Sequence, residues 1–542
     1  MGLGALFDIA TSALMTTRKA LDVTGNNIAN VNTPEYSKQD AILEVNSPPV
    51  NLVGATGRGV NVAAVMRRYD SFIQTQMLLE NQSNGRQNVL QDIYTKLEDA
   101  YNEQQGVGLA SSITDFFNSW QDVSTNPESP EQRSVVLAKA MEIVTKAKTT
   151  EDKFTDIVKS IDISVPDMVQ RINQLASNIA YYNDGVAQTE GGSTQRANDM
   201  RDKRQGALNE LAGLINFNTL EDKTGRLTVI IGDRNLVSTG NIIHPMTIQK
   251  KVDGKMQLQL DGIDITSKVT GGKIGANLEL KNSDQSGLPA AISELRRLIA
   301  ALTNKVNIVQ GKGYNLDGQR GGDIFTPPSV YTLNTNSSTA SVASAVILDN
   351  TALMYKEYEV RFTGGNNYQL YDIKNKTSIS GNLSGGKITV DGMQITFAGN
   401  PSTGDVFKIS PIESAIRDAK VLVTNTSQLA AATSPAHVPG SNGNALGMTD
   451  LAKQINPELH NSTISDYYAV VVTTSGNYAR TANDNLTFSN NMMSQIQQKR
   501  DSVSAVSLDE EAMNLVRFQK GFEAASRLIN VTNDLLDILV KL

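Results

Sequence analysis

Residues 507–542 read SLDEEAMNLVRFQKGFEAASRLINVTNDLLDILVKL, and this stretch carries a long apolar repeat. Its opening, Ser507-Leu508-Asp509-Glu510, has the pattern of a capping box, with a hydroxyl at the N-cap and a carboxylate three residues later. One apolar column recurs at every seventh residue, at Leu508, Leu515, Phe522, Ile529 and Leu536. A second column lies three residues further along, at Phe518, Ala525, Thr532 and Leu539. The two columns predict one helix of about 50 Å with a coiled-coil-like seam, which needs a partner of matching length.

The other end of the chain has a matching repeat. One column there contains Phe7, Leu14, Leu21 and Ile28, and the adjacent column contains Leu3, Ala10, Thr17, Thr24 and Val31. This helix is expected to end before Pro34, because the residue before a proline is pushed out of the helical region. We therefore expect the two chain ends to pair with each other. The alternative is that each amphipathic helix packs separately on a globular core.

Composition bounds the class of protein. The 542 residues include no cysteine and carry a formal net charge of −7. The length predicts roughly three or four domains. The lack of cysteine excludes disulfides and thiolate metal sites, and the negative charge argues against a nucleic-acid partner.

The sequence also lacks membrane and secretion signals. No apolar stretch approaches the roughly 20 residues that a membrane-spanning helix needs. The apolar run at residues 2–7 is too short for a signal peptide and follows no basic residue. We therefore expect no membrane partner and no export by the general secretory route.

The apolar periodicity changes from helical to β and back twice along the chain. A helical pattern covers residues 69–214, within which Val165-Pro166 is expected to kink or interrupt one long run. The order helical, β, helical, β, helical predicts a mainly α fold: a long-helix bundle trunk with paired terminal helices and inserted β-rich modules. The predicted domains are a terminal helical assembly unit (1–65 and 503–542), a helical trunk (66–220, 276–327 and 413–502), a small β-rich segment (221–275) and an inserted β-rich outer domain (328–412).

No residue pattern indicates catalysis. The three histidines, His244, His437 and His460, each lack a second histidine at the spacing of metal ligands. The glycine-rich residues 311–322 lack the Gly-Lys-Ser/Thr of a phosphate-binding loop. Neither β region clusters histidine with acidic residues along the sequence, so we expect no enzyme, no cofactor and no metal site.

Several motifs resemble one family. Residues 26–37, NNIANVNTPEYS, resemble the N-terminal signature of the bacterial flagellar rod, hook and hook-associated proteins. Residues 507–512, SLDEEA, with Leu515, Phe518 and Phe522, resemble the C-terminus of a hook-associated member, as do DMRDKR at 199–204, GGDIF at 321–325 and GDVF at 404–407 elsewhere in the chain. Two departures stand out: Glu35 and Ala505 occupy positions where the family often has glycine.

The resemblance implies a non-catalytic structural subunit of the flagellum, at the junction between hook and filament. It implies a ring of identical subunits in contact with the hook protein and with a second junction protein toward the filament. It also implies type III export to the outside of the cell without a cleaved signal peptide, with an export chaperone on the C-terminal helix. The predicted assembly interface consists of Phe7, Leu14, Leu21, Ile28, Leu508, Leu515, Phe522, Ile529 and Leu536.

Two alternatives stay open at the level of sequence. One is another flagellar axial subunit of hook or filament type. The other is a junction subunit whose outer β module is adhesive, which is favoured if the aromatics Tyr355, Tyr358, Tyr368 and Tyr371 are exposed. The competing role for these tyrosines is cross-strand packing.

Overall fold

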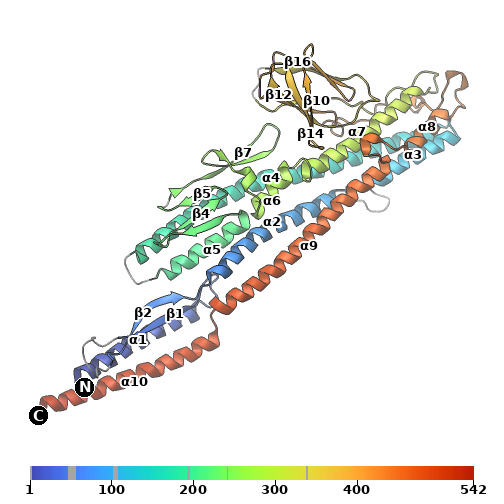
Figure 1. The fold of residues 1–542 in the computed structure, drawn as a ribbon. Helices are drawn as coiled ribbons and strands as arrows, with labels where there is room; N and C mark the ends of the chain where they lie inside the picture. Colours follow the sequence, from blue (N-terminus) through green and yellow to red (C-terminus); the bar gives the residue numbers. More distant parts are fainter. Residues whose placement is uncertain are drawn as a thin grey trace.

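The computed structural model describes residues 3–46, 57–101, 108–191, 196–240, 242–336 and 340–541. Long helices dominate and antiparallel sheets are inserted between them, which confirms the predicted mainly α fold with β modules. Figure 1 shows an elongated molecule with both chain ends at one tip and the largest β module on the far half of the trunk. Among the described residues, no helix has the length and apolar character that crossing a membrane requires.

The trunk is a bundle of long helices. Its members are α2 (Ser71–Tyr101), α3 (Leu109–Thr125), α4 (Pro130–Glu190), α5 (Asn198–Leu214), α6 (Gly272–Asn282), α7 (Leu288–Lys312), α8 (Gly443–Leu451) and α9 (Ile464–Ser504). α9 runs along α2, and α4 packs on α3 and α5. Phe116, Trp120 and Phe154 are completely buried between these helices and form the centre of the core.

Helix α4 is continuous, so Pro166 does not interrupt it; an interruption was one of the two expected outcomes. The helix begins at the N-cap Ser129, whose side chain accepts a hydrogen bond from Gln132 N, and it passes through Pro166 to Glu190. An internal proline removes one backbone hydrogen bond and costs about 3 kcal/mol or more. Val165 and Val169 are buried on the core side of the same turn, and burying two such side chains stabilises the helix by a comparable amount.

Two elements differ from the predicted division of the chain into helical and β-rich segments. Strand β1 (Gln39–Val45) pairs antiparallel with β2 (Val60–Arg67), mostly within the unit predicted to be helical (1–65). Helix α6 (Gly272–Asn282) begins within the segment predicted to be β-rich (221–275) and continues into the predicted trunk. Both elements are short and gain their stability from packing. β1 and β2 pack on α1, and α6 packs on α2. Local sequence patterns do not reveal such tertiary contacts.

The small β segment forms two sheets on the trunk. The first sheet has the order β3-β4-β5-β6 and the second has the order β7-β8-β9. Their strands are β3 (Asn218–Glu221), β4 (Leu227–Ile231), β5 (Arg234–Ser238), β6 (Ile242–Ile243), β7 (Met246–Lys250), β8 (Met256–Leu260) and β9 (Ile263–Asp264). β7 packs on α4, so this segment is anchored to the longest trunk helix.

The described residues of the outer module form eight strands in two sheets, ordered β10-β17-β12-β13-β14 and β11-β16-β15. They are β10 (Tyr331–Asn334), β11 (Ser341–Ile347), β12 (Tyr358–Gly364), β13 (Asn367–Asp372), β14 (Thr377–Asn382), β15 (Lys387–Val390), β16 (Met393–Ala398) and β17 (Val406–Ser410). Phe362, Phe397 and Phe407 meet edge to face between the sheets, with ring centroids 5.2 to 6.0 Å apart. The module therefore has its own hydrophobic core.

The four tyrosines whose exposure would favour the adhesive alternative are not exposed. Tyr355 and Tyr358 retain only 1% and 5% of their surface. Tyr368 and Tyr371 are partly buried, Tyr368 against the ring of Phe362 and Tyr371 beneath the Arg361 guanidinium. The aromatic surface on which the adhesive alternative depends is therefore absent at these four positions.

The terminal helices α1 (Leu3–Ala29) and α10 (Leu508–Lys541) lie side by side (Figure 1). The pairing of the chain ends is thus present within one chain. Ser507 caps α10, since Glu510 N donates to Ser507 Oγ at 3.5 Å. The Glu510 carboxylate does not complete the capping box; it is bound by Lys38 Nζ instead.

Candidate assembly site at the paired terminal helices

Small side chains form the contact between α1 and α10. Ala10, Thr24, Ala525 and Thr532, all from the second columns of the two repeats, are buried. A Cβ placed on Gly521 would lie only 3.1 Å from Thr17 Cγ2, so the helices approach closely at this point. Such small residues let the two backbones approach closely but bury little apolar area per turn. The contact between α1 and α10 therefore contributes little hydrophobic stabilisation.

The nine predicted interface residues flank this contact. Phe7, Leu508, Leu515 and Leu536 are exposed, and Leu14, Leu21, Ile28, Phe522 and Ile529 are partly buried. None of the nine is fully buried within the chain. The side chain of Leu539, which belongs to the second column, lies outside the described residues.

A further apolar stripe on α10 was missed by the sequence analysis. It contains Ala524, Leu528, Val531, Leu535 and Ile538, all exposed. These residues are spaced alternately four and three apart, which is the pattern of a heptad seam. This spacing was visible in the sequence and would have identified the stripe. It was overlooked because the seven-residue columns starting at Leu508 and Phe518 explained the helix without it.

A buried polar network joins the base of the terminal pair. Asn27 Nδ2 donates to Gln39 O at 2.9 Å and to Glu511 Oε2 at 3.1 Å, and Asn27 Oδ1 accepts from Gln39 N at 3.0 Å. Lys38 Nζ lies 3.0 Å from Glu511 Oε1 and 2.6 Å from Glu510 Oε2. The network therefore links α1, β1 and α10 through Asn27, Lys38 and Gln39. These residues lie in or directly after the N-terminal motif at residues 26–37.

The charges in this network stabilise one another. Burial disfavours the charged form of Lys38, but the hydrogen bonds to Glu510 and Glu511 outweigh it and raise the pKa of the ammonium. The hydrogen bond from Lys38 lowers the pKa of Glu510. Lys38 and Glu510 therefore stay charged across the neutral range. Their ion pair can fix the start of α10 relative to the segment that follows α1.

The turn after α1 connects the terminal pair to the trunk. Glu35 has φ +62°, in the left-handed region that favours glycine, so the departure from the family pattern has not removed this conformation. The Glu35 carboxylate accepts hydrogen bonds from Asn209 Nδ2 on α5 at 2.9 Å and from Arg500 Nη1 on α9 at 3.4 Å. Contacts to two trunk helices thus hold the strained residue in place.

Asp202 on α5 makes a second link between the turn and the trunk. Ser37 Oγ donates to Asp202 Oδ1 at 3.0 Å, and Arg67 Nη1 donates to the same oxygen at 2.8 Å. Burial raises the pKa of Asp202, and the hydrogen bond and charge of Arg67 counteract part of that rise. Ala505, the other departure from glycine, has φ −74° and ψ 153°, an extended conformation in which a side chain is tolerated.

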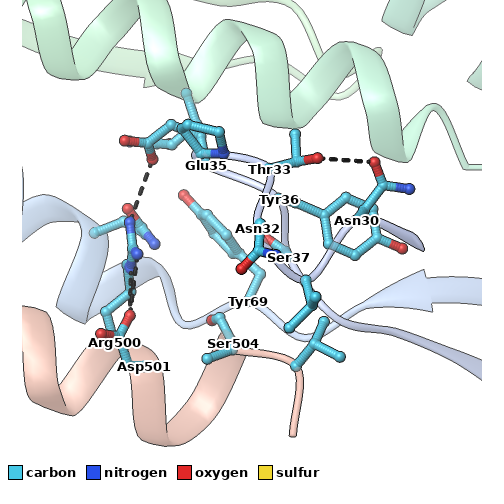
Figure 2. A pocket seen from close by; sticks show the side chains of 16 residues that line it. Asn30, Asn32, Thr33, Glu35, Tyr36, Ser37, Tyr69, Arg500, Asp501 and Ser504 are labelled. Carbon is cyan, nitrogen blue, oxygen red and sulfur yellow. Dashed lines mark hydrogen bonds and ion pairs between the residues drawn. The ribbon is translucent and has the colours of Figure 1, made fainter. Parts of the chain in front are cut away.

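A polar cavity of about 310 Å³ lies between the turn and the trunk. Figure 2 shows Tyr69 and Arg500 among the residues around it and the ion pair between Arg500 and Glu35 at its edge. Gln74 is buried in its wall, and the amide oxygen has no hydrogen-bond partner among the described residues. The arrangement positions the terminal pair relative to the trunk. In the ranges that the structure describes, no three histidine or acidic side chains gather to hold a metal ion.

Comparisons with family models cover most of the chain. Residues 94–325 match the flagellar hook-associated protein FlgK helical domain, and residues 332–411 match the D2-like domain of flagellar hook-associated protein 1. Residues 7–36 match the flagella basal body rod protein family, and residues 497–542 match the C-terminal family of the flagellar basal body rod FlgEFG proteins.

Full-length relatives and one solved structure agree with these matches. The chain is 28% identical to flagellar hook-associated protein 1 of Salmonella typhimurium over 558 residues and 26% identical to that of Escherichia coli K12 over 555 residues, with 100% of each chain covered. It is 25% identical to that of Bacillus subtilis, covering 98% of this chain and 97% of the relative. The fold is similar to the flagellar hook junction protein FlgK from Burkholderia pseudomallei, with a TM-score of 0.69 and 18% identity, covering 79% of this chain and all of that one.

Proposed function

The chain belongs to the family of flagellar hook-associated protein 1, the structural protein of the hook–filament junction, and on that premise we propose that it assembles there through its paired terminal helices. The chain is thus a structural component of the bacterial flagellum. We propose that this role is non-catalytic and needs no cofactor. The nine residues of the predicted interface, together with the second stripe on α10, form the proposed assembly surface.

One observation carries this proposal: the terminal pair leaves a large apolar surface uncovered. On α10, Leu528, Val531 and Ile538 retain 42%, 55% and 57% of their surface, and Met513, Val516 and Leu535 are also exposed. Soluble monomers seldom expose so many large apolar side chains on one element, and such patches mark interaction sites. The pair becomes fully packed only when neighbouring copies cover these side chains.

Each of the four predicted domains has a role in the proposed assembly. The terminal unit, residues 1–65 and 503–542, makes the contacts between copies. The trunk, residues 66–220, 276–327 and 413–502, carries the small β-rich segment (221–275) and the outer domain (328–412) away from the terminal pair. The trunk helices α5 and α9 support this division, because Asp202 on α5 binds Ser37 and Arg500 on α9 binds Glu35, and these contacts join the trunk to the terminal unit.

The proposed partners follow from the same family membership. Identical copies form a ring, the hook protein lies on one side and a second junction protein on the filament side. Type III export without a cleaved signal peptide places the subunit outside the cell, and an export chaperone binds the C-terminal helix beforehand. Neither nucleic acid nor membrane is a partner in this proposal.

The assembly proposal is tested with an aspartate on the proposed surface. Phe7→Asp changes α1 and leaves unchanged the sequence of α10, the helix proposed to bind the chaperone. Leu348→Asp changes an exposed apolar residue of the outer module and is the control. In a strain that lacks the chain, Phe7→Asp is expected to give hooks without filaments and secreted monomers, and Leu348→Asp is expected to restore filaments. Normal filaments with Phe7→Asp would contradict the proposal.

A further inference from the structure

Four side chains of the small β segment form one continuous chain of hydrogen-bonding groups. Asn235 Nδ2 donates to Ser238 Oγ at 3.2 Å, and Ser238 Oγ lies 3.1 Å from His244 Nε2. His244 Nδ1 lies 2.5 Å from Asp261 Oδ2. His244 had no expected role because Ser238, on β5, and Asp261, in the turn between β8 and β9, approach it only in the folded sheets.

The backbone holds each of these residues in a defined position. Ser238 on β5 is the register partner of Ile242 on β6, and His244 N donates to Leu236 O at 3.0 Å. Pro245 follows His244 and favours an extended backbone there. Asp261 and Gly262, with φ +51° and +76°, form the tight turn between β8 and β9.

The direction of each hydrogen bond follows from chemistry. An ionised Asp261 carboxylate only accepts, so His244 Nδ1 carries the proton and donates to it. His244 Nε2 then has a free lone pair, which accepts from the Ser238 hydroxyl. Asn235 donates to the same hydroxyl oxygen, so the serine proton is directed toward the imidazole. The hydrogen bonds thereby align a nucleophile (Ser238), a base (His244) and a carboxylate that orients the base (Asp261).

We propose that Ser238 is an activated nucleophile that takes an acyl or phosphonyl group from an activated donor. Ser238 Oγ bonds to the carbonyl carbon or phosphorus, and its proton passes to His244 Nε2. The bond to the leaving group breaks, and the electron pair departs with that group. Ser238 and His244 are partly exposed and Asp261 is exposed, so a donor reaches the serine from solvent. The reaction is a stoichiometric modification and goes beyond the assembly role.

The same hydrogen bonds also join the two small sheets, so the test must separate reactivity from stability. A fluorophosphonate probe supplies the donor, with fluoride as the leaving group, and mass spectrometry of the full-length protein locates the adduct. His244→Gln keeps groups that hydrogen-bond but cannot take up the proton, and it is the matched variant. Ser380, exposed on β14, reports the background reactivity of an ordinary serine.

Ser238 is expected to be labelled about 100-fold faster in the native chain than in His244→Gln, which is the lower range for a positioned general base. Asp261→Asn is expected to slow labelling at least about tenfold, because the imidazole loses its oriented tautomer. Thermal unfolding of each variant checks that the sheets are intact. Labelling of Ser238 at the rate of Ser380, or equal labelling in native and His244→Gln protein with intact sheets, would overturn the proposal.

Discussion

Lys38 Nζ and Glu511 Oε1 form an ion pair at 3.0 Å across 473 positions of sequence, and their side chains are only 4% and 1% exposed. The pair joins the strand that follows α1 to the first turn of α10. It therefore links the two chain ends where they meet the trunk. Removing one partner from a buried ion pair leaves an uncompensated charge, which is costly.

Lys38→Met is therefore expected to destabilise the terminal pair by about 3 kcal/mol. Amide hydrogen exchange measured on α1 and α10 reports this locally, since the pair can open apart from the trunk. The control is Lys520→Met, because Lys520 pairs with Glu523 at 3.0 Å on the exposed surface of α10. Exchange in the control is expected to be nearly unchanged. Equal exchange in both variants would show that the buried pair does not hold the junction.

Glu35 offers a test of backbone strain. Glu35→Gly and Glu35→Ala both lose the contacts to Asn209 and Arg500, but only alanine keeps the penalty of the left-handed conformation. The alanine variant is expected to be less stable than the glycine variant by about 1 kcal/mol. Urea unfolding of the two variants measures the difference. Equal stability would mean that the turn relaxes out of this conformation once the carboxylate is gone.

Glu190 predicts a pH dependence of stability. Arg201 Nε and Nη2 donate to its two carboxylate oxygens at 2.8 Å each, and these bonds lower the pKa of Glu190 from 4.5 to about 2. Because the folded pKa is depressed, the contribution is complete above pH 4.5 and is lost as the pH falls toward about 2. Its size is about 3 kcal/mol.

Thermal unfolding between pH 7 and pH 2 tests this contribution. Glu190→Gln is expected to be less stable at neutral pH and to lose less stability on acidification than the native chain. Glu44→Gln, which changes an exposed carboxylate on β1, is the control and is expected to follow the native profile. Parallel profiles for the native chain and Glu190→Gln would contradict the assignment.

The outer module is expected to be removable. Tyr331 on β10 and Ser410 on β17 are register partners, and the hydroxyls of Ser329 and Ser414 lie 2.9 Å apart at the neck. A Gly-Ser linker of two or three residues can therefore replace residues 331–410 without moving the trunk ends. The shortened chain is expected to fold, to be exported and to restore filaments in a strain lacking the chain. Exported protein with hooks but no filaments would show that the module takes part in assembly.

The order of helical and β regions could be read from the sequence because periodicity is local. Apolar residues at every seventh position mark α1 and α10 whatever they pack against. The same argument explains why the outer module was recognised as β-rich, and why β1 was missed. Its residues Ala41 to Val45 show little alternation, and its stability comes from pairing with β2 and packing on α1.

The candidate site depended on contacts that periodicity does not encode. The two columns of the α10 repeat point in similar directions. Only the close approach of α1 and α10 at Thr17 and Gly521 decides which column is buried. Ala525 and Thr532 are buried there, whereas Leu515 stays exposed. Likewise, Lys38 and Glu511 are unremarkable charges until α1 and α10 meet.

The sequence by itself determined the mainly α architecture, the two inserted β modules and the terminal repeats, because each depends on residues close together along the chain. The tertiary structure alone decided that α4 passes through Pro166, that Tyr355 and Tyr358 are buried, and that Ser238, His244 and Asp261 meet. These outcomes depend on which surfaces come together in space. Burial and hydrogen bonding between distant segments then outweigh the local preference of a proline, an aromatic ring or a lone histidine.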